Sequence, residues 1–334
     1  MQQKNVVRGA KFVVIGGGTG SFTLLSGLKH YVSDITALVN MADDGGSTGQ
    51  LRDELGALPP GDVRQCLVAL SDSEKVRELF NYRFAEGTLK GHAFGNLFLT
   101  ALEKMTGNFA EAVELASQVL NITGRVEPVT MTNVTLCAEG VDGEPVRGEY
   151  TIAHKELASR PKIWLEPEAE ANPRALSAIT DADVVVIAPG NLYGSLAPAL
   201  AVPGIGDALR ETNATCVYVA NLVTKPGPTE GFKVHDFADE VERLAGGDFL
   251  DYVIYNTSTP SEQLLERYAH DGEYGVGLDK DEMVQRHWEA KGARIIANAA
   301  WSGEQASDPL AHSRSFIRHD SDAVARQLMR IYFA

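Results

Sequence analysis

The chain has 334 residues, of which 44% are hydrophobic and 22% are charged, and its formal net charge is −15. This composition is typical of a globular protein with a buried core. Binding to a nucleic acid depends on a basic surface, so an acidic chain is a poor partner for one. No stretch reaches the roughly 18 apolar residues that a membrane span requires. We therefore expect neither nucleic acid binding nor a membrane span, and any phosphate site must be local and built partly from backbone dipoles.

The three cysteines, Cys66, Cys137 and Cys216, lie far apart and lack the spacing of a metal site. Their odd number argues against a disulfide framework. Residues 1–10 contain no apolar segment of the kind found in a secretion signal. We interpret the cysteines as core thiols of a cytoplasmic protein. We expect residues 1–9 to be disordered and residues 10–334 to form one α/β domain.

The first predicted strand runs directly into a cluster of glycines. Residues 11–15 are mostly β-branched or aromatic, Gly16-Gly-Gly-Thr-Gly20 follows, and an apolar-periodic run extends from Ser21 to Leu28. This pattern predicts a strand, a tight turn and a helix. In an open α/β sheet, the N–H groups of such a turn and the helix N-terminus face an anion. The residues expected to bind a phosphate are Gly17, Gly18, Thr19 and Gly20.

This turn completes neither of two common phosphate-binding patterns. The dinucleotide pattern needs a third glycine where Ser21 or Thr23 stands, depending on the register. The P-loop pattern needs a lysine at its end, and the next lysine is Lys29. A glycine turn that only packs a helix against a strand is the alternative interpretation.

A second strand, over residues 34–40, has the continuous apolar centre of a buried parallel strand. It ends in a glycine-rich loop that begins with Asn40 and carries Asp43 and Asp44 beside the first turn. Two adjacent carboxylates at a strand end can hold a cation or accept hydrogen bonds from a polar ligand. A capped Asp-Gly turn is the alternative. We predict Asn40, Asp43 and Asp44 as ligand contacts, and Asp43 and Asp44 as candidate ligands for Mg²⁺.

A helical insertion is expected over about residues 60–124. Its first helix follows Pro59 and has Asp62 near its N-terminus, and helical periodicity continues from Glu74 to Leu120. Residues 125–150 then alternate in the pattern of strand, turn and strand. We expect these antiparallel strands to extend the sheet or to form a flap.

The strand, glycine and helix pattern returns over residues 183–202, and another strand is predicted over residues 215–220. A helix is expected over residues 236–244, with later strands over 250–255 and 293–297. A terminal helix is predicted over 322–332, with Asp320 or Ser321 as its cap. Because several carboxyl ends of strands would share one ligand, further contacts are predicted. They are Gly190, Asn191, Leu192, Asn221, Lys225 and, at the mouth of the site, Arg318.

Seven segments, in order, resemble one protein family. They are Gly16-Gly-Gly-Thr-Gly20, Asp43-Asp-Gly-Gly-Ser-Thr-Gly-Gln-Leu-Arg52, Pro59-Pro-Gly-Asp-Val-Arg64, Gly91-His-Ala-Phe-Gly-Asn96, Pro189-Gly-Asn-Leu-Tyr193, Asn221-Leu-Val-Thr-Lys-Pro-Gly227 and Arg318-His-Asp320. The chain resembles the bacterial YvcK proteins, the gluconeogenesis factors, within the CofD-like superfamily. The resemblance covers about residues 10 to 333. The sequence departs from the family pattern at Asn191, Gly194 and Lys225, which bears on the identity of the ligand.

The resemblance implies a Rossmann-like, three-layer α/β/α fold with a mostly parallel sheet that binds a nucleotide. For the YvcK branch it implies a UDP-sugar, such as UDP-N-acetylglucosamine, and a regulatory role in cell shape and peptidoglycan supply during gluconeogenic growth. A cell-wall enzyme is then a candidate partner, and a homo-oligomer is expected. The other branch contains 2-phospho-L-lactate transferases, which use magnesium to move a phospholactyl group from a guanosine diphospho-lactate to a deazaflavin.

The sequence therefore leaves three functions as alternatives. A regulator would hold a nucleotide sugar without turnover, and a transferase would use magnesium at Asp43 and Asp44 to neutralise the leaving diphosphate. An NAD-dependent dehydrogenase would need an acidic residue after the second strand, which Asp43 loosely satisfies, but the incomplete glycine pattern counts against it. The sequence leaves the catalytic residues, if there are any, unassigned.

Overall fold

A parallel sheet of seven strands, in the order β10-β9-β8-β7-β1-β2-β3, forms the centre of the computed structural model, which describes residues 6–297 and 317–334. The strands are β1 (Val7–Gly16), β2 (Val32–Val39), β3 (Arg125–Pro128), β7 (Val184–Ile187), β8 (Thr215–Val219), β9 (Tyr252–Asn256) and β10 (Glu289–Ala293). The four residues of β7 are all buried, as is the second half of β1. Continuous burial explains why these strands are apolar on both faces.

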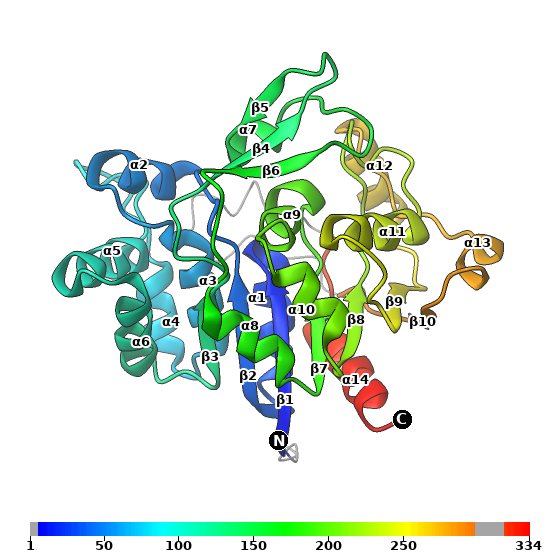
Figure 1. The fold of residues 1–334 in the computed structure, drawn as a ribbon, viewed down its shortest axis with the longest axis horizontal. Coiled ribbons are helices and arrows are strands. Elements are labelled where there is room, and N and C mark those ends of the chain that lie inside the picture. Colours follow the sequence, from blue (N-terminus) through cyan, green and yellow to red (C-terminus); the bar gives the residue numbers. More distant parts are fainter. Residues whose placement is uncertain (1–5, 298–316) are drawn as a thin grey trace.

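Helices cover both faces of this sheet (Figure 1). One face carries α1 (Gly18–Leu28), which packs against both α3 (Pro60–Leu70) and α14 (Ser321–Tyr332). The other carries α8 (Pro173–Thr180), α10 (Ile205–Glu211) and α11 (Val234–Ala245). This arrangement confirms the predicted three-layer α/β fold with a mostly parallel sheet. None of the helices in the described residues is long and apolar enough to cross a membrane.

The direction of the chain across the sheet reverses between β1 and β7. From β1 the chain passes through α1 to β2 on one side, and from β7 it passes through α10 to β8 on the other. Parallel crossovers are right-handed, so the two connections lie on opposite faces of the sheet. The carboxyl ends of β1 and β7 therefore form a topological switch point, where open α/β sheets bind their ligands.

Between β2 and β3 the chain is mainly helical. The helices there are α2 (Gly46–Leu55), α3, α4 (Glu74–Asn81), α5 (Phe94–Thr106) and α6 (Phe109–Leu120). The rings of Phe80, Phe94 and Phe98 pack together where α4 meets α5. The helices α3 to α6 occupy the stretch, about residues 60–124, in which a helical insertion is expected, and α2 precedes it.

A second sheet lies over the carboxyl ends of the main strands, at the top of Figure 1. It is antiparallel, in the order β5-β4-β6, and we call it the flap sheet. Its elements are β4 (Thr135–Glu139), β5 (Pro145–Arg147) and β6 (Ile163–Glu166), with α7 (Glu149–Ile152) after β5. Of the two arrangements expected for residues 125–150, the antiparallel strands form the flap, whereas β3 is a parallel edge strand of the main sheet.

Several boundaries differ from those predicted. Residues 7–9 belong to β1, so the expected disorder does not extend to them. Among the described residues, the last strand is Glu289–Ala293 rather than 293–297. The position was missed because this strand, which pairs with β9 at the sheet edge, carries Glu289, Lys291 and Gly292 instead of an apolar run. The helix expected from residue 196 begins earlier, as the π-helix η1 (Leu192–Leu196), and continues as α9 (Ala197–Leu200).

Two polar helices, α12 (Glu262–His270) and α13 (Lys280–Val284), have no counterpart in the sequence analysis. The predicted cap of the terminal helix is confirmed, because Asp320 Oδ1 accepts a hydrogen bond from Ala323 N at 2.8 Å. The three cysteines are buried and free, as expected.

Candidate functional site

A cavity of about 410 Å³ opens at the switch point. Its walls come from the start of α1, the loop between β7 and η1, the loop after β8 and the segment Ile317–His319. Eleven of the predicted contact residues line it: Gly17, Gly18, Thr19, Gly20, Asp43, Gly190, Asn191, Leu192, Asn221, Lys225 and Arg318. Asn40 and Asp44 are not in its wall. Segments up to 300 residues apart therefore meet at one site.

A larger hollow, of about 800 Å³, lies near the amino ends of β1 and β2, between α6 and α8. Its wall carries ion-paired side chains such as Arg174 with Glu127 at 3.6 Å. The first residues of α6 and α8 lie in its wall, but the two glycine loops at the carboxyl ends of β1 and β7 meet in the smaller cavity, which is therefore our candidate ligand site.

The turn between β1 and α1 presents backbone rather than side chains to the cavity. Gly17 is the N-cap residue of α1 and no side chain caps the helix there. Gly18 has φ of +62°, a left-handed conformation that favours glycine. A Cβ atom at Gly20 would lie 1.5 Å from the carbonyl oxygen of Pro189, so the loops after β1 and β7 touch through their backbones. The turn is thus shaped to bring N–H groups close to an anion.

Three carboxylates stand beside this turn. The backbone of Gly18 is hydrogen-bonded to the carboxylate of Asp62, and Asp43 Oδ1 accepts from Gly45 N at 3.0 Å. Burial, followed by the nearby charge of Asp43, raises the pKa of Asp62 to about 7. Burial and the charges of Asp43, Asp62 and Asp44 raise the pKa of Glu149 to about 8. Burial also raises the pKa of Asp43.

The two adjacent acids of the second loop have different surroundings. Asp43 lines the cavity, whereas Asp44 Oδ1 accepts a hydrogen bond from Tyr150 N in α7 at 2.8 Å. A Cβ atom at Gly148 would lie 2.6 Å from Asp44 Oδ2, so the flap sheet approaches this carboxylate closely. Asn40 is buried and its Oδ1 accepts from Ala42 N at 2.8 Å. Asn40 therefore shapes the loop, and Asp44 anchors the flap to it.

The remaining loops are held by their own side chains. Asn191 Oδ1 accepts from Gly194 N at 3.1 Å, and Asn221 Nδ2 donates to Gly190 O at 2.8 Å. Lys225 forms an ion pair with Glu273, which also lines the cavity. These contacts place polar groups from the loops after β7 and β8, together with Glu273, around one opening.

His319 and Tyr193 support the cavity from within the core. His319 Nε2 donates to the carbonyl oxygen of Ala220 at 3.1 Å, and burial lowers its pKa to about 4, so the ring is neutral near pH 7. Tyr193 donates from its hydroxyl to Glu240 Oε1 at 2.8 Å, and Glu240 is fully buried and paired with Arg243. Arg318, the neighbour of His319, therefore lies in a segment that is fixed to the end of β8.

Two of the three carboxylates, Asp62 and Glu149, are not among the contacts predicted from the sequence. Asp62 lies in a segment that was interpreted only as a helix start, although its place among the seven family segments was a usable signal. Glu149 stands in a helix of four residues, 87 residues after Asp62, and no local pattern marks it. Only the folded chain brings it to the cavity.

Known proteins resemble this chain over nearly its whole length. The sequence profile of the CofD family, described as 2-phospho-L-lactate transferase CofD, matches residues 12–300. The putative gluconeogenesis factor of Clostridium acetobutylicum is 42% identical over 98% of this chain and 71% of its own length. The gluconeogenesis factor of Bacillus subtilis is 39% identical over 96% of this chain and 97% of its own.

A crystal structure of a protein from Bacillus halodurans has the same fold. It superposes with a TM-score of 0.87 at 35% identity, covering 96% of this chain and 99% of the other. A second crystal structure from that organism, of a member of the UPF0052 family, gives a TM-score of 0.86 at 34% identity.

Proposed function

Because the chain belongs to the gluconeogenesis factor family within the CofD family, we propose that its cavity binds a nucleotide sugar, such as a UDP-sugar, and that this binding is regulatory. The observation that carries the proposal is the uncapped N-terminus of α1, which meets the glycine loop after β7 at the switch point. Backbone donors and a helix dipole there suit the diphosphate. The cavity volume is within the usual range of small-molecule sites.

The acids beside the turn bear on how a diphosphate is held. A carboxylate at Asp62, hydrogen-bonded to Gly18, repels a phosphate at the same turn. A magnesium ion between them would remove this repulsion, and it prefers oxygen ligands. Asp43, Asp62 and Glu149 offer carboxylate oxygens, the ligand type that Mg²⁺ prefers. Asp43 keeps its proposed role as a metal ligand, and for Asp44, whose Oδ1 accepts a hydrogen bond from Tyr150 N, we propose a role in holding the flap.

We further propose that the nucleotide sugar reports cell-wall precursor supply during gluconeogenic growth, and that the liganded protein acts on a cell-wall enzyme, as a homo-oligomer. The second candidate function is a 2-phospho-L-lactate transferase, and the acid cluster beside the phosphate turn is the observation that favours it. Magnesium held there would neutralise the leaving nucleoside phosphate. Both functions use the same cavity.

Calorimetry with UDP-N-acetylglucosamine, UDP, GDP and NAD, each with and without magnesium chloride, tests the proposal. We expect the UDP-sugar to bind most tightly, in a magnesium-dependent manner. Binding of GDP in preference to every uridine nucleotide would contradict it. Incubation with guanosine diphospho-lactate and a deazaflavin then separates the two functions, because transfer of the phospholactyl group releases GMP.

A further inference from the structure

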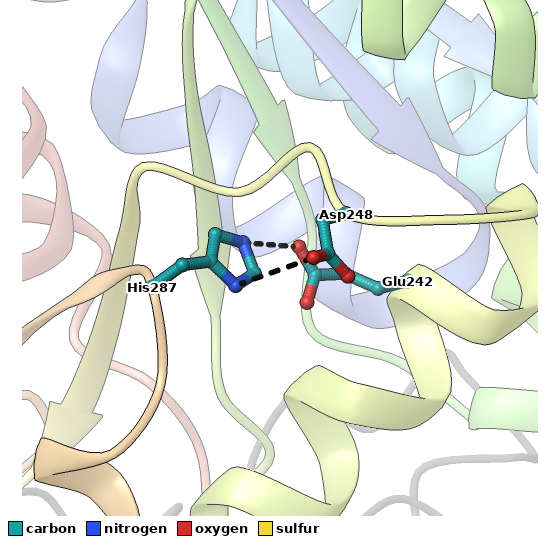
Figure 2. A group of neighbouring side chains, drawn as sticks. All are labelled: Glu242, Asp248 and His287. Carbon is teal, nitrogen blue, oxygen red and sulfur yellow. Dashed lines mark ion pairs between the residues drawn. The ribbon is translucent and has the colours of Figure 1, made fainter.

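A histidine and two carboxylates meet at the edge of the main sheet opposite the cavity. Glu242 lies near the end of α11, Asp248 follows the Gly246-Gly247 turn after that helix, and His287 precedes β10. Each offers one ligand atom, and these three atoms lie within 4.8 Å of one another. Figure 2 shows the imidazole facing both carboxylates. The cluster stands before β9 and β10 begin, so it lies at the amino ends of these parallel strands.

In the part of the chain that the structure describes, only the imidazole of His287 forms an ion pair with these two carboxylates. His287 Nε2 lies 2.9 Å from Glu242 Oε1, and Nδ1 lies 3.9 Å from Asp248 Oδ2. The nearby arginines are committed elsewhere, since Arg243 pairs with Glu240 and Arg286 with Asp239 and Glu282. Among the ion pairs of residues 6–297 and 317–334, no lysine or arginine reaches Glu242 or Asp248. Two close carboxylates that share one imidazole leave the cluster short of positive charge.

The carboxylate of Glu242 is held in place before any ion arrives. Its side chain is buried, and its Oε1 accepts hydrogen bonds from Phe249 N and Leu250 N, both at 2.9 Å. Its Oε2 accepts no hydrogen bond from the described residues. A buried charge is costly unless it is paired or bound to a metal. The side chain of Asp248 is 81% exposed and is therefore able to turn onto an ion beside Glu242.

We propose that Glu242, Asp248 and His287 bind a zinc ion. Zinc takes imidazole nitrogen and carboxylate oxygen in a tetrahedral set, and a water would complete the fourth position. The histidine favours zinc over magnesium, which prefers oxygen ligands alone. The ion would join the turn after α11 to the segment before β10 and so hold this edge strand to the sheet. The site is separate from the nucleotide cavity and independent of its function.

Calorimetry on chelator-treated protein tests this site, with zinc chloride as the titrant and magnesium in excess to occupy the acids of the cavity. Wild type should take up one zinc, and His287→Gln should weaken its binding by more than about tenfold, since even a residue that only supports a metal ligand is worth about 10–100-fold. Asp248→Asn, which leaves the backbone contacts of Glu242 intact, should also weaken it. Zinc should raise the melting temperature of wild type but not of His287→Gln.

His270→Gln is the matched control, because His270 is an exposed histidine with a single acidic neighbour, Asp271, at 3.3 Å. Its zinc affinity should equal that of wild type. Equal zinc binding by wild type and His287→Gln would overturn the site, as would equal losses in His287→Gln and His270→Gln. A cobalt-loaded protein whose visible spectrum lacks the bands of tetrahedral Co²⁺ would overturn the proposed geometry.

Discussion

The carboxyl group of Asp62 is buried beside Asp43, and its pKa is raised from 3.8 to about 7. The folded state therefore binds this proton more tightly than the unfolded chain does. Where the folded state holds more protons, the free energy of unfolding decreases as the pH rises. The stabilising effect of this proton is present at low pH and is lost as the pH rises from about 4 to about 7. A cation bound beside the ionised carboxylate of Asp62 would offset the free-energy cost of burying its charge.

We expect Asp62→Asn to raise the melting temperature of the ligand-free protein near pH 8, with a smaller effect near pH 5, because the amide carries no charge to bury. The same variant should lose the stabilisation that magnesium chloride gives the wild type. Differential scanning calorimetry at both pH values, with and without magnesium, measures this. Asp53→Asn, on the exposed surface of α2, is the control. A variant that is less stable at both pH values and still responds to magnesium would contradict the assignment.

Gly18 offers a second test at the residue scale. Its φ of +62° costs an alanine about 1–2 kcal/mol, but a Cβ atom there would meet only Asp62 Oδ1, at 3.9 Å. We expect Gly18→Ala to fold and to lose nucleotide affinity, because its methyl group occupies the approach to the turn. Gly56→Ala is the matched control: φ is +59°, nothing lies within 4 Å, and the residue ends α2 away from the cavity. Similar stability losses with unequal affinities would support the phosphate turn, and unchanged affinity in Gly18→Ala would refute it.

Arg318 lines the cavity beside the anchored ring of His319. A guanidinium can hold a phosphate through two parallel hydrogen bonds. Arg318→Ala should weaken the UDP-sugar complex by about 1.5–3 kcal/mol, with little change in the melting temperature of the ligand-free protein. Titration of the UDP-sugar into this variant and into the control Arg326→Ala measures the difference. The control removes an exposed ion pair with Asp322 in α14. Wild-type affinity would exclude Arg318 from the site, and a large loss of stability would make its role structural.

At the scale of elements, the strands that were predicted well are those whose residues are buried on both faces. The strand β7 is a continuous apolar run, and β2 and β8 are buried over residues 35–39 and 216–219; such buried runs mark parallel strands. The edge strand β10 was misplaced because its exposed positions carry charged residues. The flap strands β4 and β5 lie in the stretch where alternation predicts strands, whereas β6 was not predicted, and alternation does not say which sheet a strand joins.

The residues of the site also divide into those that local sequence patterns predict and those that they do not. The glycine turn, the Asp43 loop and the loop after β7 were predictable, because strand, glycine and helix follow each other locally in the sequence. Glu149 was not predictable, because the flap sheet delivers it to the cavity through pairing that no local pattern encodes. The cavity is thus a product of local turns and of long-range placement.

The contact of α1 with α14 gives a prediction at this scale. A Cβ atom at Gly27 would lie 2.1 Å from the carbonyl oxygen of Ser321, the first residue of α14. Gly27→Ala should therefore push the helices apart and lower the free energy of unfolding by about 1–3 kcal/mol. It should also weaken nucleotide binding, because Arg318 directly precedes α14. Chemical denaturation and titration measure both effects, with the neighbouring variant Ser26→Ala as control. A stability equal to wild type would contradict the close packing.

At the scale of the whole molecule, the proposed nucleotide site lies in a protein with a net charge of −15. At the switch point, backbone N–H donors of the loops after β1 and β7 lie together. The net negative charge of the protein makes the surrounding electrostatic potential negative. Backbone dipoles act at short range, whereas the net charge acts over the Debye length. Binding strength and the rate of encounter should therefore depend on different parts of the molecule.

The long-range field leads to a prediction about association. A UDP-sugar carries negative charge, so the acidic protein should repel it during its approach. Added salt shortens the Debye length from about 30 Å at 0.01 M to about 8 Å at 0.15 M and screens that repulsion. We therefore expect the association rate of the UDP-sugar to increase with sodium chloride at constant magnesium, as measured by stopped-flow fluorescence. Uridine, which is uncharged, should associate at a rate independent of salt. A rate for the UDP-sugar that falls with salt would mean that local cations such as Arg318 dominate the field at the cavity mouth.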